Sequence, residues 1–77
     1  MKNIIDNELS VFCENIKTLR KREGLSKKEM AKKLGIGVKN LTLLESGVVS
    51  KRLGAHILIN IRKFFHISPH DMFSTKI

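Results

Sequence analysis

Apolar side chains recur with a helical period along most of this chain. They fall three or four positions apart between Leu9 and Leu19, between Met30 and Leu44, and between Ile57 and Phe65. Because this spacing places them on one face of an α-helix, the pattern predicts an all-α fold. We expect five helices, at about 8–22, 27–34, 38–45, 54–65 and 69–73, and no convincing strand.

The ends of these helices carry recognisable start and stop signals. Gly24 and Gly47 stand where a helix needs a left-handed residue to end it. Ser26, with Glu29 three residues later, predicts a capping box at the start of the second helix. Ser68 followed by proline predicts the start of the last one.

The whole chain, residues 1–77, is expected to form a single domain with its core at about 8–73. Any of Asn3, Asp6 and Asn7 could cap the first helix. Residues 1–7 and 74–77 are expected to be mobile ends.

The first and fourth helices are predicted to supply most of the core. The expected buried residues are Leu9, Phe12, Cys13, Ile16 and Leu19, with Ile57, Leu58, Ile61, Phe64 and Phe65. Arg20 falls inside the first apolar arc, and a charge there needs a partner. We predict an ion pair with Glu45; the alternative is that Arg20 extends into solvent. Ile59 points away from the fourth stripe, which makes it either an ordinary exposed residue or a contact for self-association.

The centre of the chain predicts two short helices joined by a sharp turn. Met30, Ala31 and Leu34 share one face, and Gly35-Ile36-Gly37 then breaks the helix. The next helix buries only Leu41 and Leu44. Two such helices form a helix-turn-helix, although an ordinary helical hairpin gives the same pattern.

The outer face of the second of these helices is the candidate binding surface. At 100° per residue, four side chains point roughly away from the buried leucines: Val38, Lys39, Thr42 and Leu43. In a DNA-binding helix-turn-helix this face enters the major groove, led by its N-terminal residues.

Composition favours a polyanionic partner for this surface. Fifteen lysines and arginines against seven acidic residues give a net charge of +8 on 77 residues. Nucleic acid is the first candidate, ahead of a merely soluble lysine-rich protein and of an anionic membrane surface. Lys27 and Lys28 lie in the first turn of a helix, where the dipole and an ammonium group together attract phosphate.

Other chemistry receives little support from the sequence. Cys13 is the only cysteine and occupies an apolar arc, so we interpret it as a core residue in a reduced, cytoplasmic protein and not as a reactive thiol. His66 and His70 are four residues apart, but a predicted helix break lies between them. They therefore do not share one helix face on which to bind a metal ion. We expect no metal, no cofactor, no membrane insertion and no enzymatic activity.

These motifs resemble the lambdoid-phage Cro/repressor helix-turn-helix proteins, the XRE family of five-helix DNA-binding transcriptional regulators. The resemblance covers about residues 16–73 and is strongest in the twenty-residue pattern at 27–46. The matching positions are Met30, Ala31, Leu34, Gly35, Ile36, Leu41 and Leu44, together with the flanking segments GLS at 24–26, ESG at 45–47 and HISPHDMF at 66–73.

The resemblance assigns roles to individual residues. It implies base reading by Val38, Lys39 and Leu43, with Asn40 and Thr42 beside them. It implies phosphate contacts from Ser26, Lys27 and Asn40 and from the loop that holds Lys51 and Arg52, to which the charge pattern adds Lys28. It also implies an ion pair between the first and third helices, which falls on Arg20 and Glu45.

The sequence departs from the family pattern at several of these positions. Lys27 stands where glutamine is common, and it binds phosphate as a flexible point charge. Val38 and Leu43 offer only apolar contact, suited to a thymine methyl group, so Lys39 is the strongest donor on the reading face. The loop after the third helix is slightly longer than usual and lacks the frequent proline. His66 occupies a turn position where glycine is common.

The function expected from all this is a sequence-specific, repressor-like regulator that binds double-stranded DNA. Family members commonly dimerise on two half-sites about 34 Å apart, and in so short a chain we expect homodimers that form weakly or only on DNA. Two alternatives stay open. One is a protein-interaction module that uses Val38 and Leu43, and the other is nonspecific nucleic-acid binding through charge.

Overall fold

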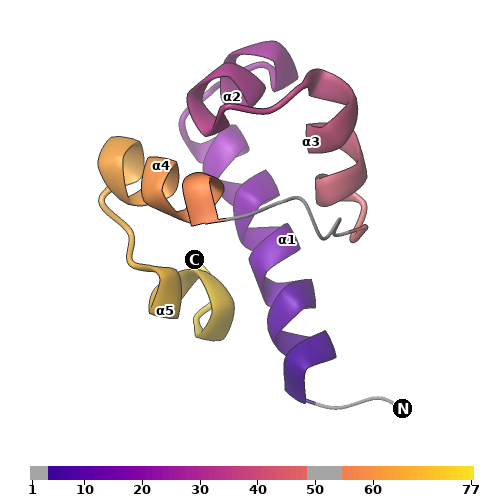
Figure 1. Ribbon diagram of the computed structural model, residues 1–77, viewed down its shortest axis with the longest axis vertical. Helices are drawn as coiled ribbons and strands as arrows, with labels where there is room; N and C mark the ends of the chain where they lie inside the picture. Colours follow the sequence, from indigo (N-terminus) through magenta and orange to yellow (C-terminus); the bar gives the residue numbers. More distant parts are fainter. Residues whose placement is uncertain (1–3, 49–54) are drawn as a thin grey trace.

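The computed structural model describes residues 4–48 and 55–77, with no account of the side chains of residues 4–7 and 55. The described chain forms the helices α1 (Ile4–Arg22), α2 (Lys27–Leu34), α3 (Val38–Glu45), α4 (Ala55–Phe65) and α5 (Pro69–Ser74) (Figure 1). The all-helical fold predicted from the apolar period is therefore confirmed.

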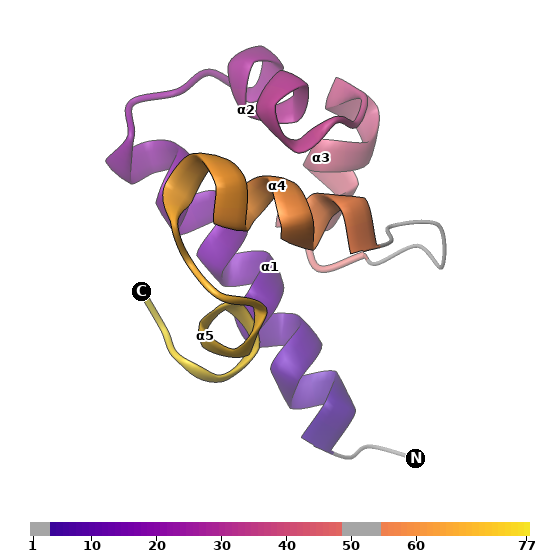
Figure 2. The same ribbon diagram turned by 60° about the vertical axis from the view of Figure 1, so that its left-hand side comes forward.

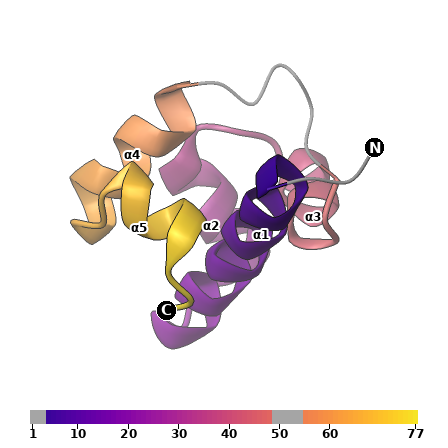
Figure 3. The same ribbon diagram turned by 90° about the horizontal axis from the view of Figure 1, so that it is seen from below.

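The long helix α1 has two of the other helices as its main packing partners. It contacts α3 and α5, while α2 contacts α3 and α4. Figures 1 and 3 show α3 and α5 on opposite sides of α1. Side chains from all five helices meet in one core: Phe12, Cys13, Ile16, Leu19, Met30, Ala31, Leu34, Leu41, Leu44, Ile57, Ile61 and Met72. The Cys13 thiol lies in this core, and burial raises its pKa.

The predicted helix signals act as expected around α2. The Ser26 hydroxyl accepts a hydrogen bond from the amide of Glu29, and the Glu29 carboxylate accepts one from the amide of Ser26. At the other end Gly35 adopts φ +77°, a conformation that glycine tolerates best. The Ile36 amide then donates to the carbonyl of Ala31, so the turn toward α3 is tightly defined.

The core differs from the predicted one at four positions. Phe64 is predicted to be buried but is 46% exposed, and the ammonium groups of Lys33 and Lys63 lie 5.1 and 5.6 Å from its ring centroid. Its position near the end of α4 explains this, because the apolar stripe runs past the helices that cover it. Three more of the residues predicted to be buried are only partly buried: Leu9, Leu58 and Phe65. Ile59 does point outward, with 63% of its surface exposed.

Two helix boundaries also differ from the expected ones. α1 begins at Ile4 and not near Glu8, so Asp6 and Asn7 lie inside the helix; Asn3 lies outside the described residues. Once a helix is nucleated, each further residue adds a hydrogen bond at little cost. α5 continues one residue further than predicted, to Ser74. The predicted start of α4, at about Gly54, lies outside the described residues, and the helix is described from Ala55.

The C-terminal segment is attached to α1 by hydrogen bonds, although residues 74–77 were expected to be mobile. Asn15, which is 1% exposed, donates from Nδ2 to the carbonyls of Met72 and Thr75 at 2.9 and 2.8 Å. Its Oδ1 accepts from the amide of Ile77 at 3.2 Å, and Arg22 donates to the Ile77 carbonyl. A single buried amide side chain thus fixes α5 and the residues after it.

His66 is the one described residue other than glycine with a positive φ, +60°. A left-handed conformation costs a residue with a Cβ roughly 1–2 kcal/mol, whereas glycine there costs about 0.5–1 kcal/mol of unfolded-state entropy. We therefore expect His66→Gly to raise the free energy of unfolding by about 0.5–1 kcal/mol. Urea denaturation of the two proteins measures this difference. A lower stability of His66→Gly would show that the imidazole makes a contact worth more than the backbone strain.

Candidate nucleic-acid interface

Helix α3 has two faces of opposite character. Leu41 and Leu44 are completely buried on one side, packed into the core. On the other side Val38 and Leu43 are 43% and 41% exposed, and Lys39 and Thr42 are exposed with them. The structure therefore brings the four predicted base-reading residues together on one open surface. Asn40, predicted to contact phosphate, is exposed at its edge.

An ion pair anchors the C-terminal end of α3 to α1. Arg20 Nε lies 2.7 Å from Glu45 Oε2 and its Nη2 lies 3.2 Å from Glu45 Oε1, so the contact is bidentate. Arg20 also donates to the carbonyl of Leu25. The hydrogen bond that Arg20 donates to Glu45 raises the pKa of Arg20, and burial only partly offsets this effect. The pair predicted from the helical period is thus present, and it fixes the end of α3 that lies away from the turn.

Helix α4 contacts the end of α2 and the turn that leads to α3, and the sequence did not predict this contact. Asn60 Nδ2 donates to the carbonyl of Leu34 at 3.0 Å, which satisfies an acceptor at the last residue of α2. A Cβ added at Gly35 would lie 3.2 Å from the same Asn60 nitrogen and 3.5 Å from His56 Cδ2. The two α4 side chains therefore sit against the turn that joins α2 to α3. His56 and Asn60 are four residues apart and so share one face of α4. This spacing is the only sequence signal that could have suggested their contact with the turn.

The start of α2 supplies the predicted phosphate-contacting groups. Ser26, Lys27 and Lys28 are all exposed there. The Ser26 hydroxyl accepts one hydrogen bond in the capping box, from the amide of Glu29. Hydrogen bonds from Ser26, first from its backbone amide and then from its side chain, lower the pKa of Glu29.

The groups at α2 and α3 lie close together. Figure 2 shows α2 and α3 side by side, joined by the short turn, and the two helices are in contact. Lys51 and Arg52, the remaining predicted phosphate contacts, lie outside the described residues. The arrangement offers a central exposed face on α3, with an exposed basic helix start on α2.

A family model described as a helix-turn-helix domain matches residues 13–76, more than four-fifths of the chain. The chain belongs to the helix-turn-helix domain family. The match includes both helices of the motif, the turn between them, and α4 and α5. No curated protein matches this helix-turn-helix domain, and no solved structure does.

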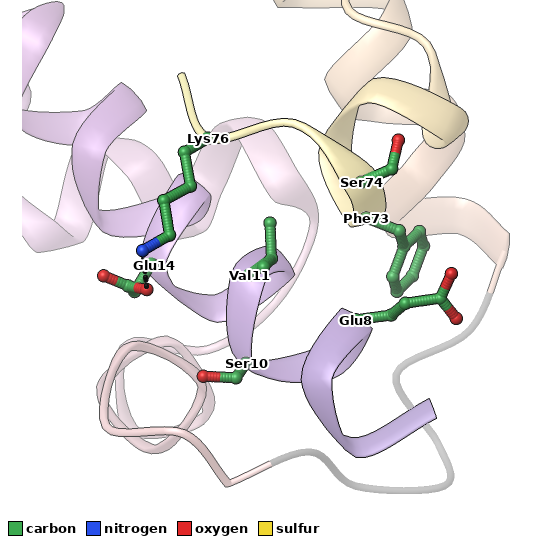
Figure 4. Close-up of a pocket in the computed structure, with 7 residues that line it drawn as sticks. All are labelled: Glu8, Ser10, Val11, Glu14, Phe73, Ser74 and Lys76. Carbon is green, nitrogen blue, oxygen red and sulfur yellow. Dashed lines mark ion pairs between the residues drawn. The ribbon is translucent and has the colours of Figure 1, made fainter. Parts of the chain in front are cut away.

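Elsewhere the helix-turn-helix domain has an open hollow of about 470 Å³ between α1 and the C-terminal segment. Figure 4 shows its lining, including the 3.8 Å ion pair between Lys76 and Glu14. None of the predicted DNA-contacting residues lines it. The described part of the chain contains no group of three or more His, Cys, Asp or Glu residues that could hold a metal ion. Its helices are all too short or too polar to cross a membrane.

Proposed function

We propose that this protein is a sequence-specific double-stranded DNA-binding regulator of the Cro/repressor type. In this proposal α3 enters the major groove with Lys39 foremost, while Ser26, Lys27, Lys28 and Asn40 bind phosphates on either side. The observation that carries the proposal is the exposure of Val38, Lys39, Thr42 and Leu43 on a helix whose opposite side is fully buried. A face built only for packing would be covered.

The regulator would act as a repressor by occupying its operator, without catalysis, cofactor or metal, in the cytoplasm. Two copies would bind half-sites about one helical turn, roughly 34 Å, apart. The outward-facing Ile59 is a candidate for a weak contact between copies. Selecting bound sequences from a random duplex pool tests whether the protein prefers a sequence and whether two copies bind it. A regulator that binds as two copies should select a two-fold symmetric site.

The roles of two lysines can be separated by mutation. Lys39→Ala is expected to weaken binding to the selected duplex by about 1–3 kcal/mol more than binding to a scrambled duplex, because it removes a donor to base edges. Lys27→Ala should weaken both duplexes alike and reduce the slope of log affinity against log salt by about 1, because it removes a phosphate contact. Fluorescence-polarisation titrations at several salt concentrations measure both effects. Equal losses for the two variants on both duplexes would contradict the assignment.

A second candidate function is binding to a protein through the same surface. It is favoured by the exposure of Val38, Leu43 and Val48, three large apolar residues on or just after α3. Absence of duplex binding at low salt would support this candidate. Binding with a steep salt dependence and no preferred sequence would instead indicate a nonspecific nucleic-acid binder.

A further inference from the structure

The exposed face of α3 has an ordered arrangement of one cation and two apolar side chains. At 100° per residue, the direction opposite Leu41 and Leu44 falls within about 10° of Lys39. Leu43 lies one turn further along the same ridge, and Val38 stands at the N-terminal end of the helix. The charged side chain therefore occupies the middle of the face, with a branched apolar group before it and another after it.

The chemistry of the major groove restricts what these side chains can contact. Base edges there present hydrogen-bond donors, acceptors and one apolar group, the methyl on C5 of thymine. An apolar side chain placed over a polar base edge removes water from that edge and returns no hydrogen bond, which is unfavourable. Val38 and Leu43 therefore fit a methyl group and disfavour unmethylated cytosine. Lys39 fits the O6 and N7 acceptors of guanine.

Val38 and Leu43 are exposed, so a methyl group of the DNA can reach them without a change in the protein conformation. Val38 and Leu43 keep about two-fifths of their surface open, on a helix whose opposite side is packed into the core. The Arg20–Glu45 ion pair holds one end of this helix, and Asn60 packs against the turn that leads to it. Because α3 is held in this way, Val38 and Leu43 keep a constant spacing along the groove.

From this geometry we propose that Val38 and Leu43 select the operator by contacting the C5 methyl groups of pyrimidines in the major groove. The proposal rests on the function proposed above and specifies what α3 reads. The same methyl group occurs on thymine and on 5-methylcytosine. The operator then carries 5-methylpyrimidines on both sides of a guanine read by Lys39.

The test removes single methyl groups from the DNA. In the duplex selected from the random pool, each thymine is changed in turn to deoxyuridine, which removes only the methyl group. Burial of one methyl group predicts a loss of affinity of roughly fourfold at each contacted thymine. Leu43→Ala should bind the unmodified duplex more weakly by a similar factor, and it should lose the response to deoxyuridine at only one position in each half-site. Val38→Ala should lose it at a different position.

Val48→Ala is the matched control. It shortens the same type of side chain at another exposed position, after the end of α3, and should keep the full response to deoxyuridine. Circular dichroism of each variant checks that the helical content is unchanged, which is expected because all three side chains are exposed.

Each outcome either identifies the base that carries the methyl group, thymine or 5-methylcytosine, or overturns the proposal. Sensitivity to deoxyuridine that is lost in Leu43→Ala or Val38→Ala identifies thymine as the source. Insensitivity to deoxyuridine together with tighter binding when a cytosine is replaced by 5-methylcytosine identifies methylated cytosine. Insensitivity to both changes overturns methyl reading but leaves sequence-specific binding intact. Failure to bind any duplex overturns the proposed function as well, and favours a protein partner for this face.

Discussion

Replacing Arg20 with methionine is expected to lower the free energy of unfolding by about 3–5 kcal/mol. Methionine fills much of the space but leaves Glu45, whose side chain is only 5% exposed, without the guanidinium that neutralises it. It also removes the donor to the Leu25 carbonyl. Chemical denaturation followed by circular dichroism measures the loss. In a domain of this size it corresponds to a midpoint temperature lower by more than about 10 °C.

Two variants show whether the loss comes from the stranded carboxylate. The double variant Arg20→Met/Glu45→Met should recover most of the stability, because an apolar pair replaces a buried ion pair at little cost. Arg22→Met alters an exposed arginine of the same helix and should change stability by less than about 1 kcal/mol. A small effect of Arg20→Met would mean that water reaches Glu45 and that the pair contributes as little as a surface one.

Asn15→Leu is also expected to have a large effect, lowering the free energy of unfolding by about 2–4 kcal/mol. Leucine has a similar volume but cannot replace the two hydrogen bonds that Asn15 donates to Met72 and Thr75, or the one that it accepts from Ile77. Backbone groups would then lose their partners, and the Met72 carbonyl would do so in a buried position. Denaturation measures the total loss, and amide hydrogen exchange shows where protection is lost.

The exchange pattern distinguishes a local role from a general one. The amides of Met72 and Thr75, which donate within α5, should lose protection first, while those of α2 and α3 keep theirs. Asn60→Ala is the matched control on α4, since it removes a single, partly buried hydrogen bond and should cost about 1 kcal/mol. Uniform loss of protection along the chain in Asn15→Leu would mean that Asn15 supports the whole core and not only its C-terminal part.

The parts of the fold that sequence predicts well are those set by local rules. The capping box at Ser26 and the left-handed glycines at positions 24, 35 and 47 depend on a few neighbouring residues, and all are present as expected. The Arg20–Glu45 pair was also within reach, because a charge inside an apolar arc requires a partner and few acidic residues were available. The outer face of α3 could be predicted as well, because the helical period places it opposite Leu41 and Leu44.

The features that sequence missed depend on where one element ends relative to another. A helical wheel gives the direction of Phe64 but not whether another helix lies at its height, and none of the described helices covers it fully. Asn15 lies beside the apolar arc of α1 and resembles an ordinary polar residue until the C-terminal segment is placed over it. Asn60 was missed for the same reason, because its partner is a backbone carbonyl that no side-chain pattern reveals.

The buried thiol of Cys13 gives this domain a built-in reporter of its own opening. It is the only cysteine in the chain, it is 3% exposed, and burial raises its pKa, so a thiol reagent meets a protonated and covered sulfur in the native state. Labelling therefore requires the core around α1 to open first. Pulse labelling with a mass readout would time that opening for each variant above, in a protein that lacks tryptophan and tyrosine for fluorescence.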